Sequence, residues 1–175
     1  MLELVLLFLF VVGVILWIPY IQKTTKKGAP FVAMEPEVVE EVMKLAEIKK
    51  DDVFYDLGSG DGRLVIAAAL KGAKEAYGIE IDPLRVFYSR LWLKVLRLKN
   101  AQILKQDIFK TDLSKATVVN LYLLQSTNEK LEKKLKKELK KGTRVISTAF
   151  TFPGLKPLKV SPRGTIYGPV YLYEV

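Results

Sequence analysis

A glycine-rich loop between a short apolar strand and a helix constrains the fold of this 175-residue chain more than any other feature. Residues 53–57 are predicted to form a buried strand, Gly58, Gly60 and Gly62 follow, and residues 64–71 are predicted to form a helix. Glycines at such a junction let the backbone approach a ligand closely. Ligands of open α/β sheets bind at the carboxyl ends of strands, where the strand order reverses. We therefore expect a ligand site at this loop.

Strands and helices alternate along the rest of the chain, which predicts an α/β fold with a mostly parallel sheet and an antiparallel C-terminal hairpin. The length leaves room for one domain, which we place over residues 31–175. The expected elements are helices over 36–50, 83–99 and 129–141, strands over 76–81, 103–106, 118–124 and 143–150, and a hairpin of 164–167 and 170–174 with Gly168-Pro169 between its strands.

An apolar segment precedes this domain. Residues 4–18 contain no polar side chain, and with their neighbours they approach the roughly 20 residues that a helix needs to cross a bilayer. Trp17 and Tyr20 suit a membrane interface, and lysines follow the apolar run while none precedes it. We predict a single-pass transmembrane anchor over residues 1–21, a linker over 22–30, and a domain on the cytoplasmic side. The alternative is a cleaved signal peptide, but a basic start and a small-residue cleavage site are missing.

The composition excludes several classes of site. The chain has no cysteine and no histidine, so disulfides, thiolate zinc sites, histidine-ligated metals, Ser-His-Asp triads and Cys-His pairs are impossible, and we expect no metal site. The net charge of +9 comes from residues 84–99, with five basic side chains and no acid, and from residues 129–141, with seven lysines and three glutamates. Such charge suits nucleic acid, anionic lipid or an acidic partner, and the apolar N-terminus favours lipid at least as much as nucleic acid.

Acidic side chains around the glycine loop indicate the type of ligand. Asp56 precedes the first glycine and Asp61 lies inside the loop, so the two would repel the pyrophosphate of a dinucleotide. They suit S-adenosylmethionine, which carries an ammonium and a sulfonium but no phosphate. Glu80 lies at the end of the second expected strand and Asp107 follows the third, at positions suited to the ribose hydroxyls and the adenine amino group. Each acid alone has the alternative of capping a turn, but acids at three successive strand ends favour one shared crevice.

In these residues the chain resembles the class I, seven-β-strand methyltransferases. More narrowly, it resembles the small archaeal protein-lysine methyltransferases and the membrane-anchored mitochondrial enzymes related to them, over roughly residues 29–156. The matching segments are Tyr55-Asp56-Leu57-Gly58-Ser59-Gly60-Asp61-Gly62-Arg63, Pro30-Phe31-Val32, Gly78-Ile79-Glu80, Tyr88-Ser89-Arg90-Leu91, residues 129–135, Arg144-Val145-Ile146-Ser147 and Phe150-Thr151-Phe152-Pro153. Two features depart from related families. Relatives tend to have Pro-Tyr-Val-Pro where this chain has Pro-Phe-Val-Ala, and an Asn-Pro-Pro-Tyr-type motif, typical of adenine and glutamine methylation, is missing.

The resemblance implies a Rossmann-like sheet with helices on both faces, S-adenosylmethionine as cofactor and a protein substrate, which in membrane-anchored relatives is a membrane protein. The implied cofactor residues are Asp56, Gly58, Gly60 and Asp61 for the methionine part, Glu80 for ribose and Asp107 for adenine. The segment after the fourth strand would face the substrate, and its candidates to orient the amine are Tyr122, Ser126, Asn128 and Glu129. These have a structural alternative, because Tyr122 suits a core and Asn128 or Glu129 suits a helix start.

Four functions stay open on the sequence. The first is a membrane-anchored protein-lysine N-methyltransferase. The second is an RNA methyltransferase, suggested by the net charge but without a recognisable RNA-binding appendage, so a nucleic-acid partner is not favoured. The others are a lipid or small-molecule methyltransferase and a non-catalytic cofactor-binding module. The helix at 83–99 also has more apolar residues than one buried stripe needs, so its second side is expected against either protein or anionic lipid.

Overall fold

The computed structural model describes Val5, Val11, Val12 and residues 31–175. The chain forms two units, Met1–Phe31 and Val32–Val175. The anchor expected over residues 1–21 and the linker expected over 22–30 therefore lie outside the described residues, apart from those three valines. In the described part, no helix is long and apolar enough to cross a membrane.

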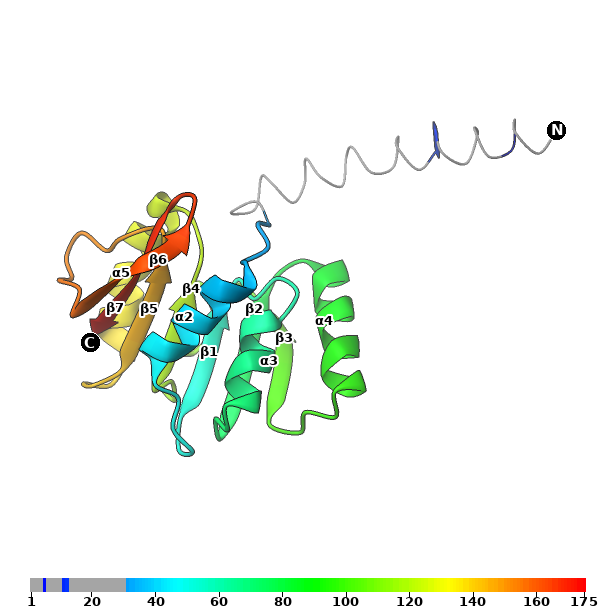
Figure 1. Cartoon of the computed structure of the whole chain (residues 1–175), viewed down its shortest axis with the longest axis horizontal. Coiled ribbons are helices and arrows are strands. Elements are labelled where there is room, and N and C mark those ends of the chain that lie inside the picture. Colours follow the sequence, from blue (N-terminus) through cyan, green and yellow to red (C-terminus); the bar gives the residue numbers. More distant parts are fainter. Residues whose placement is uncertain (1–4, 6–10, 13–30) are drawn as a thin grey trace. The chain divides into compact units, whose positions relative to one another are not determined.

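The second unit is built on one seven-stranded sheet with the order β3-β2-β1-β4-β5-β7-β6 (Figure 1). Its strands are β1 (Val53–Leu57), β2 (Glu75–Glu80), β3 (Ala101–Lys105), β4 (Val118–Leu121), β5 (Arg144–Thr148), β6 (Lys159–Thr165) and β7 (Gly168–Glu174). The first five are parallel, and β7 is antiparallel to both β5 and β6. The expected parallel sheet with an antiparallel C-terminal hairpin is confirmed. The order reverses between β1 and β4, which is where such sheets bind ligands.

Four described helices accompany this sheet: α2 (Pro36–Ala46), α3 (Arg63–Leu70), α4 (Pro83–Val95) and α5 (Gln125–Glu138). Side chains of α2, α3 and α4 share one core with alternate strand residues such as Phe54, Val118 and Ile146. Asn128 of α5 instead bonds Ser147, the neighbour of Ile146 in β5. Successive strand residues point to opposite faces of a sheet. The helices thus cover both faces, as expected (Figure 1).

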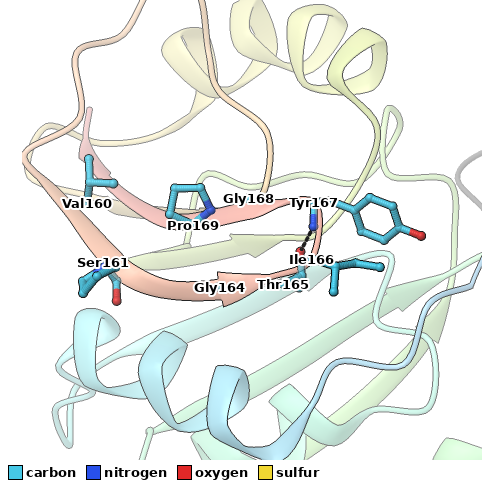
Figure 2. A pocket seen from close by; sticks show the side chains of 9 residues that line it. Val160, Ser161, Gly164, Thr165, Ile166, Tyr167, Gly168 and Pro169 are labelled. Atoms are coloured by element: carbon cyan, nitrogen blue, oxygen red, sulfur yellow. Dashed lines mark hydrogen bonds between the residues drawn. The ribbon is translucent and has the colours of Figure 1, made fainter.

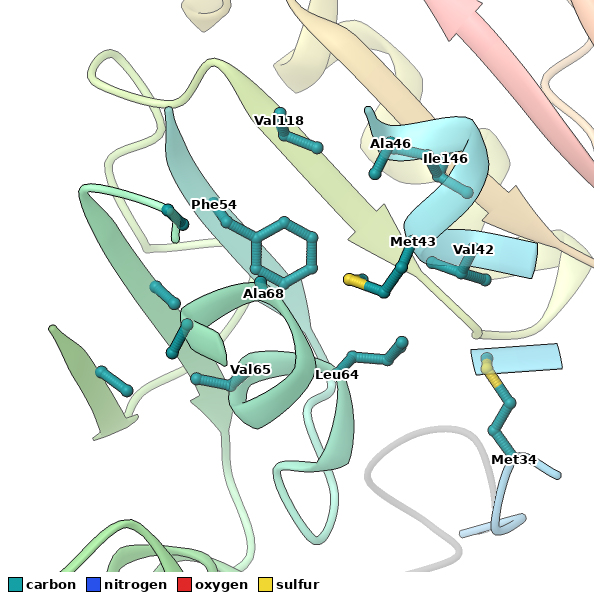
Figure 3. Close-up of a cluster of buried hydrophobic side chains, with 14 of the residues drawn as sticks. Met34, Val42, Met43, Ala46, Phe54, Leu64, Val65, Ala68, Val118 and Ile146 are labelled. Atoms are coloured by element: carbon teal, nitrogen blue, oxygen red, sulfur yellow. The ribbon is translucent and has the colours of Figure 1, made fainter. Parts of the chain in front are cut away.

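The core lies between the sheet and its first two helices (Figure 3). Phe54 of β1 is fully buried, with Met43 of α2 and Val65 of α3 in the same cluster. The strand β1 is buried at four of its five positions, and burial of each large apolar side chain contributes about 1.5–3 kcal/mol. This packing fixes β1, so the loop that follows it has a rigid base.

Several element boundaries differ from those expected. The helix α5 begins at Gln125 rather than 129, because the Leu124 carbonyl already accepts bonds from the amides of Thr127 and Asn128. The helix α4 ends at Val95 rather than 99. There the amide of Leu98 bonds the Leu93 carbonyl while Arg97 has a φ of 54°, which is a helix stop of the kind usually made by glycine.

The C-terminal hairpin also turns elsewhere than expected. Thr165 pairs with Gly168, so the turn is Ile166-Tyr167, and Gly168-Pro169 begins β7. Pro169 has no amide hydrogen, but its carbonyl accepts a bond from the Ala149 amide at 2.8 Å. A proline is tolerated at such a strand start.

The amino-terminal edge of the sheet is held by an ion pair between a buried aspartate and a partly buried arginine. Arg144, the first residue of β5, contacts Asp52 before β1 with an N···O distance of 2.6 Å. Its guanidinium also donates to the carbonyls of Ala46 and Glu47, and the Thr117 hydroxyl donates to Asp52 at 2.7 Å. Burial opposes ionisation of Asp52, but the bonds from Arg144 and Thr117 outweigh it and hold the pKa of Asp52 below its ordinary value. This carboxylate is matched within the chain.

Candidate active site

The carboxyl ends of β1, β2 and β4 meet around Asp56. In the sheet register Asp56 lies between Gly78 of β2 and Asn120 of β4. The Asn120 side-chain amide donates to the Asp56 carboxylate at 2.8 Å, and both side chains are buried. Among the described residues, no lysine or arginine forms an ion pair with Asp56. The site thus has a buried carboxylate without a matching cation.

This environment raises the pKa of Asp56 to about 7. Burial is the largest cause, since it penalises the charged form. The Asn120 bond acts in the opposite direction, and the carboxylates of Asp61 and Glu80 raise the pKa further. A cationic group placed beside Asp56 would relieve this penalty, which is the contribution that an amino-acid ammonium makes.

The glycine loop after Asp56 has a backbone conformation that few residues other than glycine adopt. Gly58, Gly60 and Gly62 have φ values of 82°, 54° and 82°. A Cβ at Gly58 would lie 2.8 Å from the Leu123 side chain, and one at Gly78 would lie 2.6 Å from the Ser59 hydroxyl. The amides of Gly58 and Ser59 both donate to the Ile79 carbonyl. The loop is therefore packed directly on β2 at Gly78, and its three glycines have backbone conformations that would strain any other residue.

Glu80 fixes the loop to the end of β2. Its carboxylate accepts the Gly60 amide at 3.0 Å, and the amides of Ile81 and Asp82 at 2.8 Å each. The side chain is buried. Glu80 thus lies at the end of its strand as predicted and is joined to the same loop as Asp56.

The other two predicted cofactor acids are placed differently. Asp107 follows β3 and is half-buried, and its carboxylate accepts the Phe109 amide at 2.9 Å, within its own turn. Asp61 is paired with Arg63, whose guanidinium also donates to the Met34 carbonyl before α2. Although burial opposes it, this pairing holds the pKa of Asp61 below its ordinary value. Asp61 therefore joins the loop to the segment before α2.

The four substrate candidates fall into two groups. Ser126 and Glu129 are exposed on the first turns of α5, where Glu129 accepts a bond from Gln125. Asn128 is buried and donates to the Ser147 hydroxyl and the Phe150 carbonyl, so its amide nitrogen orders the chain after β5. The Tyr122 ring packs against the core, and its hydroxyl is buried. Asn128 thus has a structural role through its two donated bonds, and the ring of Tyr122 has one through its packing.

Several buried polar atoms lack a hydrogen-bond partner within the described part of the chain. They are the Ser59 hydroxyl, the Asn120 and Asn128 amide oxygens, and the hydroxyls of Tyr122 and Thr148. Ser59 belongs to the glycine loop, and the other four lie on β4, at its end, on α5 or on β5. Buried polar atoms are normally satisfied, so these are open positions for ligand groups. With the glycine-rich loop and the unmatched Asp56, they fit a cationic, hydroxyl-bearing ligand such as S-adenosylmethionine.

Sequence reasoning missed Asn120 and Arg63. In the sequence, Asn120 is a single polar residue within the apolar strand β4. Only the pairing of β4 with β1 shows that it lies beside Asp56. Arg63 was visible two residues after Asp61, a spacing at which a pair is possible, but its second contact to Met34 depends on the tertiary fold.

A separate open hollow lies on the C-terminal hairpin (Figure 2). It is lined by Val160, Ser161, Pro162, Gly164, Thr165, Ile166, Tyr167, Gly168 and Pro169. Its described side chains are apolar or hydroxyl-bearing and include no acid. A cofactor site needs convergent polar groups, which are found at the glycine loop and not in this hollow.

Sequence comparison relates this chain to known methyltransferases. Residues 56–159 match the family described as ANTKMT methyltransferase domain. A protein-lysine N-methyltransferase of Saccharolobus islandicus is 39% identical over 83% of this chain and 93% of its own length. A human lysine N-methyltransferase, named for a subunit of ATP synthase, is 35% identical over 83% of this chain, which spans 63% of that protein.

A similar solved structure contains S-adenosyl-L-homocysteine, the demethylated form of the cofactor. The crystal structure of an RNA methyltransferase from Salinibacter ruber in complex with S-adenosyl-L-homocysteine has a TM-score of 0.77 and 39% sequence identity. The match covers 82% of this chain and 94% of that one. The fold, the glycine loop and these matches agree, and the chain belongs to the ANTKMT methyltransferase domain family, enzymes that use S-adenosylmethionine.

Proposed function

We propose that this chain is a protein-lysine N-methyltransferase. The observation that carries the proposal is the buried Asp56 carboxylate, unmatched by any described cation, directly before the glycine-rich loop, where it suits the ammonium of S-adenosylmethionine. The names of the archaeal and human relatives support lysine as the acceptor. The sequence also lacks the motif that is typical of adenine and glutamine methylation, which agrees with them.

In this proposal each acid has one part of the cofactor to hold. Asp56 binds the ammonium, because this contact supplies the charge that the site lacks. Glu80 is pinned by three backbone amides, which leaves its carboxylate in a fixed orientation for the ribose hydroxyls. Asp107 follows β3 and accepts the adenine amino group. Asp61 acts through Arg63 and positions the loop.

S-adenosylmethionine supplies an electrophilic methyl group, so the chain needs to orient the acceptor amine and exclude water. A lysine has a reference pKa of about 10.4 and must lose a proton before it attacks, which an apolar surrounding favours. Of the four candidates, Tyr122 and Asn128 have buried oxygens without a described partner. We propose that these oxygens orient the amine, while Ser126 and Glu129 contact the substrate from the exposed start of α5.

The apolar N-terminus suggests where this reaction takes place. We propose that residues 1–21 hold the enzyme to a membrane, with the domain on the cytoplasmic side. The human relative is named for part of ATP synthase. A membrane protein is accordingly the proposed substrate.

RNA methylation is a second candidate, favoured by the name of the Salinibacter ruber structure and by the net charge of +9. The experiment that separates the two uses the full chain in detergent with methyl-labelled S-adenosylmethionine, a membrane-protein extract and total RNA. Label on lysine, located by mass spectrometry and lost in Glu80→Ala, is the expected result. Asp51→Asn, at an exposed position at the other edge of the sheet, is the matched control and should keep activity. Label in RNA with none in protein would overturn the lysine assignment.

A further inference from the structure

The helix α4 has two apolar faces, of which one is exposed. Val86, Ser89 and Leu93 are buried and face the sheet. Six large side chains lie on the opposite side and are 49–63% exposed: Leu84, Phe87, Tyr88, Leu91, Trp92 and Val95. Their spacing of three and four residues makes them one continuous strip, which we call the outer face of α4. Isolated exposed apolar residues are ordinary, but a strip of six marks a contact surface.

Basic side chains border the outer face on both sides. At about 100° per residue, Arg90 and Lys94 lie along one border and Arg85 along the other. Arg90 is held there because its guanidinium donates to the Ile103 carbonyl at 2.8 Å. The sequence from 83 to 106 contains six basic residues and no acid. The borders of the strip therefore carry basic side chains, and the acid nearest to the helix in the sequence is Asp82, at its N-cap.

The second basic helix, α5, provides a comparison within the same molecule. Its apolar residues Leu131 and Leu135 are buried. Its surface pairs Lys134 with Glu138 and Lys136 with Glu132, each at 2.6 Å. This is a solvated face with both signs of charge. The outer face of α4 has neither the acids nor the polar cover, so a requirement for solubility does not explain it.

We propose that the outer face of α4 binds the surface of an anionic lipid bilayer. A helix with an apolar strip between basic borders inserts its strip at the level of the headgroups, and its cations contact the lipid phosphates. Tyr88 and Trp92 combine an apolar ring with a polar edge, as residues at this depth do. A second copy of this chain fits less well, because a symmetric contact would bring two acid-free basic surfaces together.

Lipid binding at this face would also orient the active site. The helix begins at Pro83, three residues after Glu80, so the outer face starts at the edge of the sheet that holds the glycine loop. Ile81 and Phe109 follow β2 and β3 at this edge, and each is 44% exposed. The site would face acceptors at the membrane surface. This contact is independent of the N-terminal segment and goes beyond the methyl-transfer reaction.

The fluorescence of Trp92 tests the proposal in the full chain. The sequence has two tryptophans, so Trp17→Phe leaves Trp92 as the single reporter. The protein is added to vesicles of phosphatidylcholine, with or without phosphatidylglycerol, whose acyl chains are brominated to quench nearby tryptophans. We expect clear quenching in the anionic vesicles, reduced by high salt. Adding Leu91→Glu and Val95→Glu should abolish it.

The matched control is Leu158→Glu with Val160→Glu, which changes two residues that are 62% and 52% exposed at the opposite end of the sheet. This variant should keep the quenching, and both variants should keep the parent's thermal unfolding temperature. Unquenched Trp92 in protein that sediments with anionic vesicles would overturn the proposal. A concentration-dependent blue shift of Trp92 without lipid would also overturn it, since a second copy would then cover the face.

Discussion

Two aspartates at the two ends of β1 show how one strand serves both stability and ligand binding. Asp52 and Asp56 are four residues apart and both are buried. Asp52 is matched by Arg144, which lowers its pKa, whereas Asp56 has Asn120 as its bonding partner and a pKa raised to about 7. The chain supplies the counter-charge at the amino-terminal edge. At the carboxyl-terminal edge, the described residues form no ion pair with Asp56, and we propose that a cationic group of the ligand supplies the counter-charge.

The largest expected effect is on stability at the amino-terminal edge. Asp52→Asn leaves the Arg144 guanidinium without its carboxylate, and breaking such a buried pair costs about 3 kcal/mol. We expect this loss in the free energy of unfolding, measured with urea, and an unchanged affinity for S-adenosyl-L-homocysteine. Asp51→Asn should change neither quantity. If Asp52→Asn lost ligand affinity at a temperature where it is folded, the proposed division between a stabilising Asp52 and a ligand-binding Asp56 would be wrong.

The reverse pattern is expected at the other end of the strand. Asp56→Asn removes the charge that we assign to the ligand ammonium, and a charge-assisted hydrogen bond is worth about 1.5–3 kcal/mol, or roughly 10–100-fold in affinity. Calorimetric titration with S-adenosyl-L-homocysteine measures this loss. Stability at pH 8 should stay the same or rise, since an uncharged amide costs less to bury. A destabilised variant with normal affinity would make Asp56 a structural residue like Asp52.

The two aspartates should also respond to pH in opposite directions. Asp56 has a folded pKa of about 7 against an ordinary value of 3.8, so the folded ligand-free protein keeps a proton that the unfolded chain has released. Its contribution to stability therefore falls as pH rises from about 4 to 7. Asp52 has a lowered pKa and stabilises the fold above 3.8, with loss as the pH falls below that value. Urea unfolding of the parent, Asp52→Asn and Asp56→Asn across this pH range measures both trends.

Ligand affinity should follow the same titration. It should rise by up to tenfold between pH 6 and pH 8 as Asp56 ionises, and this dependence should be absent in Asp56→Asn. Calorimetry at several pH values tests it. A parent protein with flat affinity over this range would refute the assigned contact.

Most of the fold could be predicted because its signals are local. The strand β1 and the loop after it follow from an apolar run and closely spaced glycines, and these determine where the site lies. Boundaries failed where tertiary bonds decide them. Leu124 starts the turn into α5 with an ordinary apolar residue, and Arg97 ends α4 in a conformation usually given to glycine.

The site was predicted less completely than the fold. The positions of Asp56 and Glu80 at strand ends were predicted correctly, and their roles toward the cofactor stay predictions. The contact of Asn120 with Asp56 was not predicted. It depends on the pairing of two neighbouring strands whose residues are 64 positions apart in the sequence. The pairing of Asp61 with Arg63 was missed as well, and the role of Asp61 toward the cofactor stays a prediction.

The contact between Gly78 and the glycine loop has a consequence for how this site can vary. A Cβ at position 78 would meet the Ser59 hydroxyl at 2.6 Å and the Ile103 side chain at 2.5 Å. Gly78 has no unusual φ, so its own backbone would accept any residue. A side chain at 78 would require Ser59 in the loop and Ile103 in β3 to shift, and the two positions are therefore coupled. The second strand of the sheet is in this respect as much a part of the binding loop as the glycines themselves.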